Sequence, residues 1–224
     1  MKFAVSTNQE DIKDSSGGGY INHSGIYDVT LNYVQLAETK NKATQINFNV
    51  TNNGMDQTIY GPILVNTDGQ FNAITKSLLN RLCIVAGMDN DYVIETETAE
   101  YPVGKEGKLM EMEVIPELTD IDLKIRVQME YSLWEGNIQE KRAVKAFYRA
   151  DGATAAEAIS GEDIGKRLAL DEEKYASNVT YKDGLTEEDV KAWIEERINA
   201  SKAPSKGPVA VPKANSARPK FGTR

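Results

Sequence analysis

The sequence predicts an α+β fold, mainly an antiparallel β-sheet or barrel that is OB-like, with an inserted helix and C-terminal helices. Three observations support this class. Apolar and polar residues alternate in several segments of the first 150 residues, which is the pattern of half-buried strands. One segment between them switches to helical spacing, and the composition becomes helical and acidic after residue 150. Strands on both sides of one helix match a five-stranded OB-type barrel, which has its helix between the third and fourth strands.

The first strands are predicted within residues 20–65. Residues 1–19 are polar and end in a Ser-Ser-Gly-Gly-Gly run, so we expect a flexible lead-in. Apolar side chains then alternate at 27–33 and again at 46–50, and an Asn-Asn-Gly turn signal follows the second run. A third run, 58–65, contains Pro62, which restricts that strand to a sheet edge or a bulge.

The middle of the chain contains the helix. Ile74, Leu78, Leu82 and Val85 recur at helical spacing, and Gly87 is a stop signal. Residues 89–118 are ambiguous, because short apolar runs flank a segment rich in glycine and lysine, and a further hairpin is one interpretation.

The clearest strand comes next. Seven successive odd positions from Ile121 to Leu133 are apolar or aromatic, which predicts a long strand with one buried face. A Glu-Gly-Asn turn leads into a partner strand from Ile138 to Arg149. The buried face of that partner is expected to hold Val144, Ala146 and Tyr148. Residues 20–150 are therefore predicted to form one β-rich domain.

Residues 151–200 contain 13 acidic and six basic residues and are expected to form helices that pack on this domain. Thr186 followed by three acidic residues predicts a helix N-terminus. The stripe formed by Val190, Trp193, Ile194 and Ile198 has two interpretations, packing on the sheet or docking of a partner.

The charge reverses after residue 200. Residues 201–224 are rich in Pro, Ala, Gly and Ser, carry no acid and are expected to form a disordered tail. Its six bases are Lys202, Lys206, Lys213, Arg218, Lys220 and Arg224. A cationic arm on a chain of net charge −8 indicates a polyanionic partner, and the alternative is a terminus whose charge only aids solubility.

Few residues of the chain suit catalysis, so we expect a protein that is not an enzyme and has no cofactor or metal. The one histidine, His23, excludes multi-histidine metal sites, and Cys83 lies in the apolar run of the helix. A magnesium-dependent nuclease using Asp120, Asp122 and Glu130 is a minor alternative. A single cysteine fits a reducing cytoplasm, and neither a signal peptide nor a membrane span is predicted.

The period of two also predicts a binding face. If the odd positions of 121–133 are buried, the even positions face outward beside the outward positions of the partner strand. This face would combine cations with two exposed aromatic rings, as binders of single-stranded nucleic acid do. Its members are Lys124, Arg126, Trp134, Lys141, Lys145, Phe147 and Arg149. In the alternative interpretation, the C-terminal helices cover Trp134 and Phe147, and Asp122 and Glu130 pair with the cations.

Several short segments resemble single-stranded DNA-binding proteins of tailed bacteriophages. They are Ser15–Ile21 with Ser24–Tyr27, Val29–Val50, Lys76–Cys83 with Gly87, and Phe147–Glu157. The resemblance covers about the first 160 residues. It implies binding of single-stranded DNA in phage replication, recombination or transcription, within the cytoplasm of the infected bacterial host. In some podoviruses such a protein is also a cofactor that recruits a phage RNA polymerase. Many members end in an acidic tail, whereas the end of this chain is basic.

The sequence therefore favours a non-catalytic, largely sequence-tolerant single-stranded DNA-binding protein, with a phage RNA or DNA polymerase as a further candidate partner. The competing hypothesis is an adaptor whose acidic helical region docks a polymerase or host protein. Exposure of Trp193 would favour the adaptor, and burial of its ring would favour a structural role.

Overall fold

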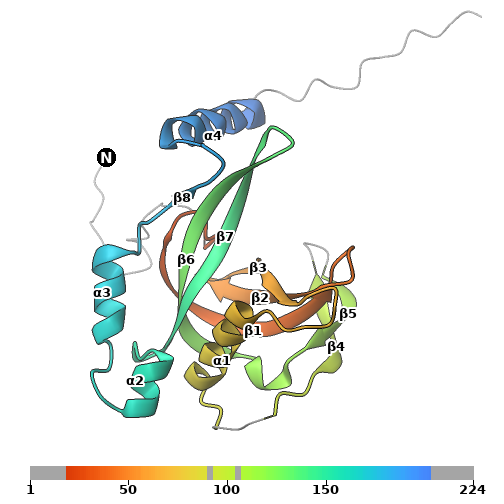
Figure 1. Ribbon diagram of the computed structural model, residues 1–224, viewed down its shortest axis with the longest axis vertical. Helices are drawn as coiled ribbons and strands as arrows, with labels where there is room; N and C mark the ends of the chain where they lie inside the picture. The colour runs from red at the N-terminus through yellow and green to blue at the C-terminus, as the bar shows by residue number, and fades with distance from the viewer. Residues whose placement is uncertain (1–18, 90–92, 104–106, 203–224) are drawn as a thin grey trace, which may run out of the picture. The chain divides into compact units, whose positions relative to one another are not determined.

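The computed structural model describes residues 19–89, 93–103 and 107–202, and the side chains up to residue 199 (Figure 1). The predicted lead-in, apart from Gly19, and the tail after Lys202 lie outside the described residues. The chain divides into two units, with the boundary between Leu185 and Thr186. Within the described residues the first unit is an α+β fold with an eight-stranded, mostly antiparallel sheet, which confirms the predicted class.

Three strands form an antiparallel meander at the start of the first unit. They are β1 (Gly25–Glu38), β2 (Thr44–Asn52) and β3 (Met55–Val65). Asn53 and Gly54 join β2 to β3 with positive φ angles of 47° and 76°, the backbone form that a tight two-residue hairpin requires. Pro62 lies in β3, which is at the end of the strand order, so the prediction of an edge strand is confirmed.

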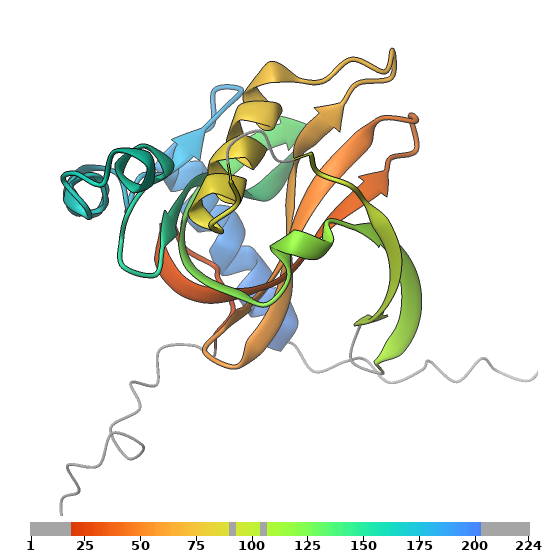
Figure 2. The ribbon, with the colours of Figure 1, turned by 90° about the horizontal axis from the view of Figure 1, so that it is seen from below.

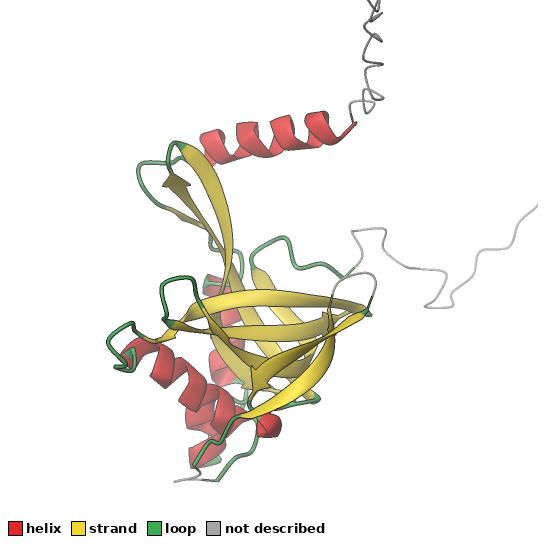
Figure 3. Cartoon of the chain, turned by 90° about the vertical axis from the view of Figure 1, so that its right-hand side faces the viewer, coloured by secondary structure: helices red, strands yellow, loops and turns green. Residues whose placement is uncertain are grey.

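The long predicted strand and its partner are β6 (Ile121–Trp134) and β7 (Asn137–Arg149). β6 pairs with β1 through its first half and with β7 from Leu123 to Trp134. β7 in turn lies against β3, where the Arg142 guanidinium donates hydrogen bonds to the Thr58 carbonyl (2.8 Å) and to Gln57 Oε1 (2.7 Å). The strand path β3-β2-β1-β6-β7 therefore curls back on itself, as in an OB-type barrel (Figure 3).

Helix α1 (Ala73–Val85) follows β3 and packs against both β3 and β7 (Figure 2). Asn72 caps it, because its side-chain oxygen accepts hydrogen bonds from the backbone N–H groups of Ile74 and Thr75. The ambiguous segment contains a hairpin, β4 (Glu97–Val103) with β5 (Lys108–Val114), and a 3-10 turn, η1 (Pro116–Leu118). β5 pairs with the end of β1, so the hairpin is an insertion between α1 and the fourth barrel strand.

The core lies inside the barrel and under α1. It joins apolar side chains of β1, β2, β3, β6 and β7 to Leu78, Leu82 and Val85 of α1. The chain just before β1 is anchored to the same unit, because the side chains of Asn52 and Gln57 both donate to the Gly19 carbonyl (2.8 Å each). Gly19 approaches so closely that a Cβ there would lie 1.8 Å from the Asn52 carbonyl oxygen, which requires glycine.

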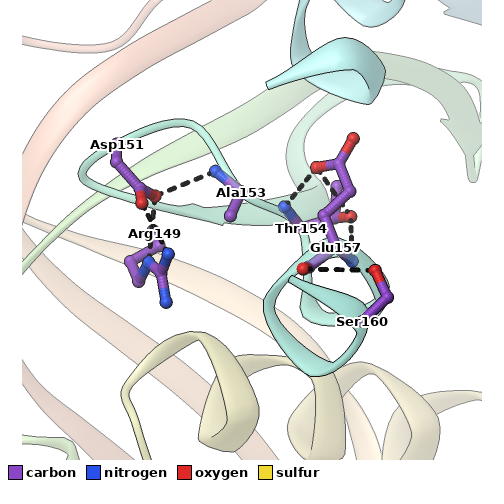
Figure 4. Close-up of polar contacts among 6 residues, drawn as sticks. All are labelled: Arg149, Asp151, Ala153, Thr154, Glu157 and Ser160. Atoms are coloured by element: carbon purple, nitrogen blue, oxygen red, sulfur yellow. Dashed lines mark hydrogen bonds and ion pairs between the residues drawn. The ribbon is translucent and has the colours of Figure 1, made fainter. Parts of the chain in front are cut away.

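Two short helices and a strand follow the barrel. They are α2 (Ala155–Ser160), α3 (Lys166–Lys174) and β8 (Thr180–Tyr181), and β8 pairs in parallel with β6. Figure 4 shows how the chain leaves β7: Arg149 pairs with Asp151, and a capping box of Thr154 and Glu157 starts α2. α2 lies against both α1 and β7, so the chain up to Leu185 belongs to the barrel's own unit.

The second unit contains α4 (Glu187–Lys202). Thr186 and Asp189 exchange side-chain-to-backbone hydrogen bonds at its start, as the predicted N-terminus requires. Within the helix the Arg197 guanidinium lies over the ring of Trp193, 4.5 Å from its centroid.

Candidate nucleic-acid interface

The even positions of β6 face away from the core, as the sequence predicts, but two of their cations are already paired. Lys124 forms an ion pair with Asp28 of β1. Arg126 is mostly buried, 3.7 Å from the Asp171 carboxylate, and lies over the ring of Tyr175 (5.6 Å to the centroid). These two side chains therefore fasten β6 to its neighbours more than they offer open charge to a ligand.

The prediction that Phe147 faces outward is wrong. The register of β6 and β7 shifts by one residue, because Arg126 pairs with Ala146 whereas Val127 pairs with Val144. This bulge leaves Lys145 unpaired in the ladder and reverses which positions of β7 face inward beyond it. Phe147 therefore lies opposite Ile125, is 4% exposed and meets Phe48 edge-to-face, with the ring centroids 5.4 Å apart.

The same bulge turns Tyr148 away from the barrel core, where the sequence predicts it to lie. Tyr148 is fully buried on the opposite face of β7, where its hydroxyl donates a 2.5 Å hydrogen bond to Asp171 of α3. Burial, reinforced by this carboxylate, raises the pKa of the Tyr148 hydroxyl. Arg167 approaches the other oxygen of Asp171 at 3.0 Å, so one buried carboxylate joins β7 to α3.

The predicted residues do not form one site. Trp134 is 67% exposed at the tip of the β6–β7 hairpin, whereas Arg149 lies at the other end and pairs with Asp151 at 2.5 Å. The 13 residues of β7 span about 40 Å along the strand. Lys141 and Lys145 line one concave surface, and Lys145, Arg126 and the buried Phe147 line a second.

The first surface is a groove of about 290 Å³ between α1, β3 and β7. Lys141 and Lys145 line it from β7, Arg81 from α1 and Tyr60 from β3. The Tyr60 side chain is 61% exposed, so its ring is available for contact. We call this surface the Tyr60 groove.

A second hollow of about 450 Å³ adjoins the first and shares Arg81 and Lys145 with it. Its further cations are Arg126 of β6 and Arg167 of α3, and its one carboxylate is Asp171. Apolar side chains of α1 and α2, among them Ile84 and Ile159, line the rest. We call this surface the Ile159 pocket.

The two hollows carry a surplus of positive charge on an acidic chain. Five cations and two carboxylates, Glu130 and Asp171, line them together. Each carboxylate is shared between two bases: Glu130 binds Lys145 (2.5 Å) and Lys182 (2.6 Å). Burial alone would raise the pKa of Glu130, but the hydrogen bonds from these lysines outweigh it and hold the pKa below its ordinary value.

Two cations of the Tyr60 groove have no carboxylate partner among the described residues. The Arg81 Nε–H donates only to the Ser77 carbonyl one turn earlier (3.2 Å), and Lys141 is exposed on β7. Their charges are therefore open to an anionic ligand.

Sequence reasoning missed Tyr60, Arg81 and Arg167. Tyr60 had a readable signal, because it is the outward position between Ile59 and Gly61 in the third strand. Arg81 lies on the polar face of the predicted helix, but nothing in the sequence indicates that this face adjoins β7. Arg167 lies in α3, and the sequence predicted helices in the acidic region without distinguishing this one.

The cysteine and the carboxylates that the sequence offered for other chemistry have structural contacts. Cys83 is buried, and burial raises the pKa of its thiol to about 11, so it packs as a small apolar side chain. Asp122 accepts a hydrogen bond from Thr30, whereas Glu130 is held by two lysines eight residues along the strand. Within the described ranges, no three His, Cys, Asp or Glu side chains are grouped as a metal site would require.

The remaining expectations concern the helices and the tail. None of the helices in the described part of the chain is long and apolar enough to span a membrane. Trp193 is half-buried, so it does not discriminate between docking and a structural role. Of the predicted tail cations, Lys202 is the last residue of α4, and the other five lie outside the described residues.

No protein-family model matches the chain, and no curated protein matches it.

Proposed function

We propose that this protein binds single-stranded DNA, without catalysis and with little sequence preference, along the Tyr60 groove. One observation carries the proposal: three different elements bring an exposed aromatic ring and two cations, Arg81 and Lys141, to the same groove, and neither cation has a carboxylate partner among the described residues. Cations that follow a backbone and a ring that stacks on a base are the two components of sequence-tolerant single-strand binding. An OB-like barrel is a common scaffold for that activity.

The resemblance of the sequence to phage single-stranded DNA-binding proteins supports the same function. A role in phage replication, recombination or transcription, in the cytoplasm of the infected bacterium, follows as part of the proposal, with a phage polymerase as the candidate protein partner. The basic tail would add electrostatic attraction to the strand. Trp134, about 40 Å along the hairpin from Arg149, would stack only on a strand that extends to the tip of that hairpin.

The test is fluorescence anisotropy of a labelled mixed-sequence single strand, with the duplex alongside, across a salt series. Each lost phosphate contact should flatten the plot of log affinity against log salt concentration by about 0.7. Lys141→Gln and Arg81→Gln should each reduce the salt slope by this amount. Lys108→Gln is the matched control, because Lys108 is exposed on the β4–β5 hairpin and lines neither hollow.

Tyr60→Ala should act differently. Stacking contributes about 1–3 kcal/mol per base, so the affinity should fall by about 5- to 150-fold while the salt slope stays unchanged. Absence of single-strand binding at low salt, or equal affinity for duplex, would overturn the proposal. If both the Arg81 and the Lys141 variants keep the wild-type salt slope, the strand does not follow this groove.

A further inference from the structure

The Ile159 pocket differs from the Tyr60 groove in volume and in composition. Five elements surround it: α1 and α2 supply the apolar side chains, and β6, β7 and α3 complete the wall. Its volume of about 450 Å³ lies within the range of pockets that hold small organic ligands. It is therefore large enough for a nucleotide.

The charge of the pocket suits a phosphate. Arg81, Arg126, Lys145 and Arg167 line it against the single carboxylate of Asp171. That carboxylate is already engaged by Tyr148 and Arg167, and Lys145 shares Glu130 with Lys182. The pocket thus has three more positive than negative side chains. A guanidinium group can donate two parallel hydrogen bonds to the oxygens of one phosphate.

The apolar part of the pocket suits a base. Ile159 is 73% exposed at the end of α2, and Ile84 lines the pocket from α1. Apolar side chains beside a cluster of cations match the two parts of a ligand that has a ring and a charged substituent.

We propose that the Ile159 pocket holds one nucleotide of the bound strand, with its phosphate near Arg81, Lys145 and Arg167 and its base against Ile84 and Ile159. This inference rests on the proposed function. Because the Tyr60 groove and the pocket share Arg81 and Lys145, the nucleotide in the pocket is the neighbour of the one that stacks on Tyr60.

The first experiment compares Ile159→Glu with Ile164→Glu in the full chain. Both isoleucines are exposed (73% and 48%), and Ile164 lines neither the groove nor the pocket, so the two variants introduce the same charge at different places. Ile159→Glu should weaken single-strand binding about tenfold or more, because it removes the apolar contact and adds an anion beside the phosphate. Ile164→Glu should bind as the wild type does, and thermal unfolding should show that both variants are folded.

The second experiment locates the strand. A single strand carrying 5-iododeoxyuridine is crosslinked by ultraviolet light, and the attached peptides are identified by mass spectrometry. Peptides containing Ile84 or Ile159 should carry the crosslink, and excess unlabelled single strand should abolish it. A parallel titration with dTMP shows whether the pocket takes a free nucleotide instead.

The outcomes separate the two proposals. Wild-type affinity in Ile159→Glu, with flattened salt slopes in the Lys141 and Arg81 variants, would overturn the pocket inference and leave the proposed function intact. Binding of dTMP that Ile159→Glu removes, without an effect on single-strand affinity, would make the pocket a site for free nucleotide and would also overturn the inference. If the wild type binds no single strand, the proposed function and the inference fail together.

Discussion

Phe147 and Tyr60 offer a direct test of which aromatic ring packs in the core and which is available to a ligand. Sequence periodicity places Phe147 on the outer face, whereas the structure buries it in the core opposite Ile125. Tyr60, on β3, is the exposed ring that lines the groove. Replacing each ring by alanine should therefore give opposite results, loss of stability in one case and loss of binding in the other.

The magnitude for Phe147→Ala follows from its burial. A buried Phe→Ala substitution costs about 3–5 kcal/mol, since it removes transfer free energy and leaves a cavity. The edge-to-face contact with Phe48 accounts for about 0.5–1.5 kcal/mol of such a loss. For a unit of this size, each kcal/mol lowers Tm by about 2–4 °C, so the expected fall is about 6–20 °C. Tyr60→Ala should change the free energy of unfolding by less than about 0.5 kcal/mol.

The assay is urea unfolding followed by tryptophan fluorescence and circular dichroism, together with single-strand binding by anisotropy. Phe147→Leu is the milder variant if the alanine variant does not fold, and it should cost less than about 1.5 kcal/mol. The folded Phe147→Leu protein should retain wild-type affinity for single-stranded DNA. If Phe147→Leu keeps full stability but loses binding, the ring faces outward and the register shift between β6 and β7 is wrong.

Three further predictions concern contacts that fix the fold around the site. Tyr148→Phe should lower the free energy of unfolding by about 1.5–3 kcal/mol, because it removes the hydrogen bond to the buried Asp171 carboxylate; a change below about 0.5 kcal/mol in urea unfolding would mean that the arginines alone satisfy Asp171. Glu130 has a lowered pKa in the folded state, so its ion pairs stabilise the protein above its ordinary value of 4.5, and this contribution is lost as the pH falls through the lower folded value. The stability difference between wild type and Glu130→Gln should therefore be largest near pH 7 and shrink on acidification, and a difference independent of pH would contradict the assignment. Gly19→Ala should release the chain before β1, because its Cβ would lie 1.8 Å from the Asn52 carbonyl oxygen; limited proteolysis should then cut before Tyr20 faster than in wild type, and equal rates would refute the anchor.

Much of the barrel could be predicted because its elements have strong local patterns. Seven alternate apolar or aromatic residues define β6, Asn53 and Gly54 define a tight turn, and apolar residues at helical spacing define α1. Each of these signals arises from one segment and its own backbone geometry. Pro62 indicated an edge strand for the same reason, because its missing N–H cannot take part in a ladder on both sides.

The candidate site could be predicted only in part. Lys141 and Lys145 were found because they lie in a strand whose outward face could be read. Phe147 was assigned to the wrong face, because a bulge depends on the pairing of two strands and shows no sign in either strand alone. Arg126 and Lys124 were correctly turned outward, but the acids that neutralise them, Asp171 and Asp28, come from distant parts of the chain.

By itself, the sequence determined the fold class and the succession along the chain of three strands, a helix and two long strands, since alternation, spacing and turn residues act within short segments. Only the tertiary structure decided which cations pair with described carboxylates and which exposed aromatic ring lines the groove. Arg81, Lys141 and Tyr60 are far apart in the sequence and meet because α1 packs across β3 and β7. A groove exists only between elements, so its charge and shape depend on contacts that no single segment specifies.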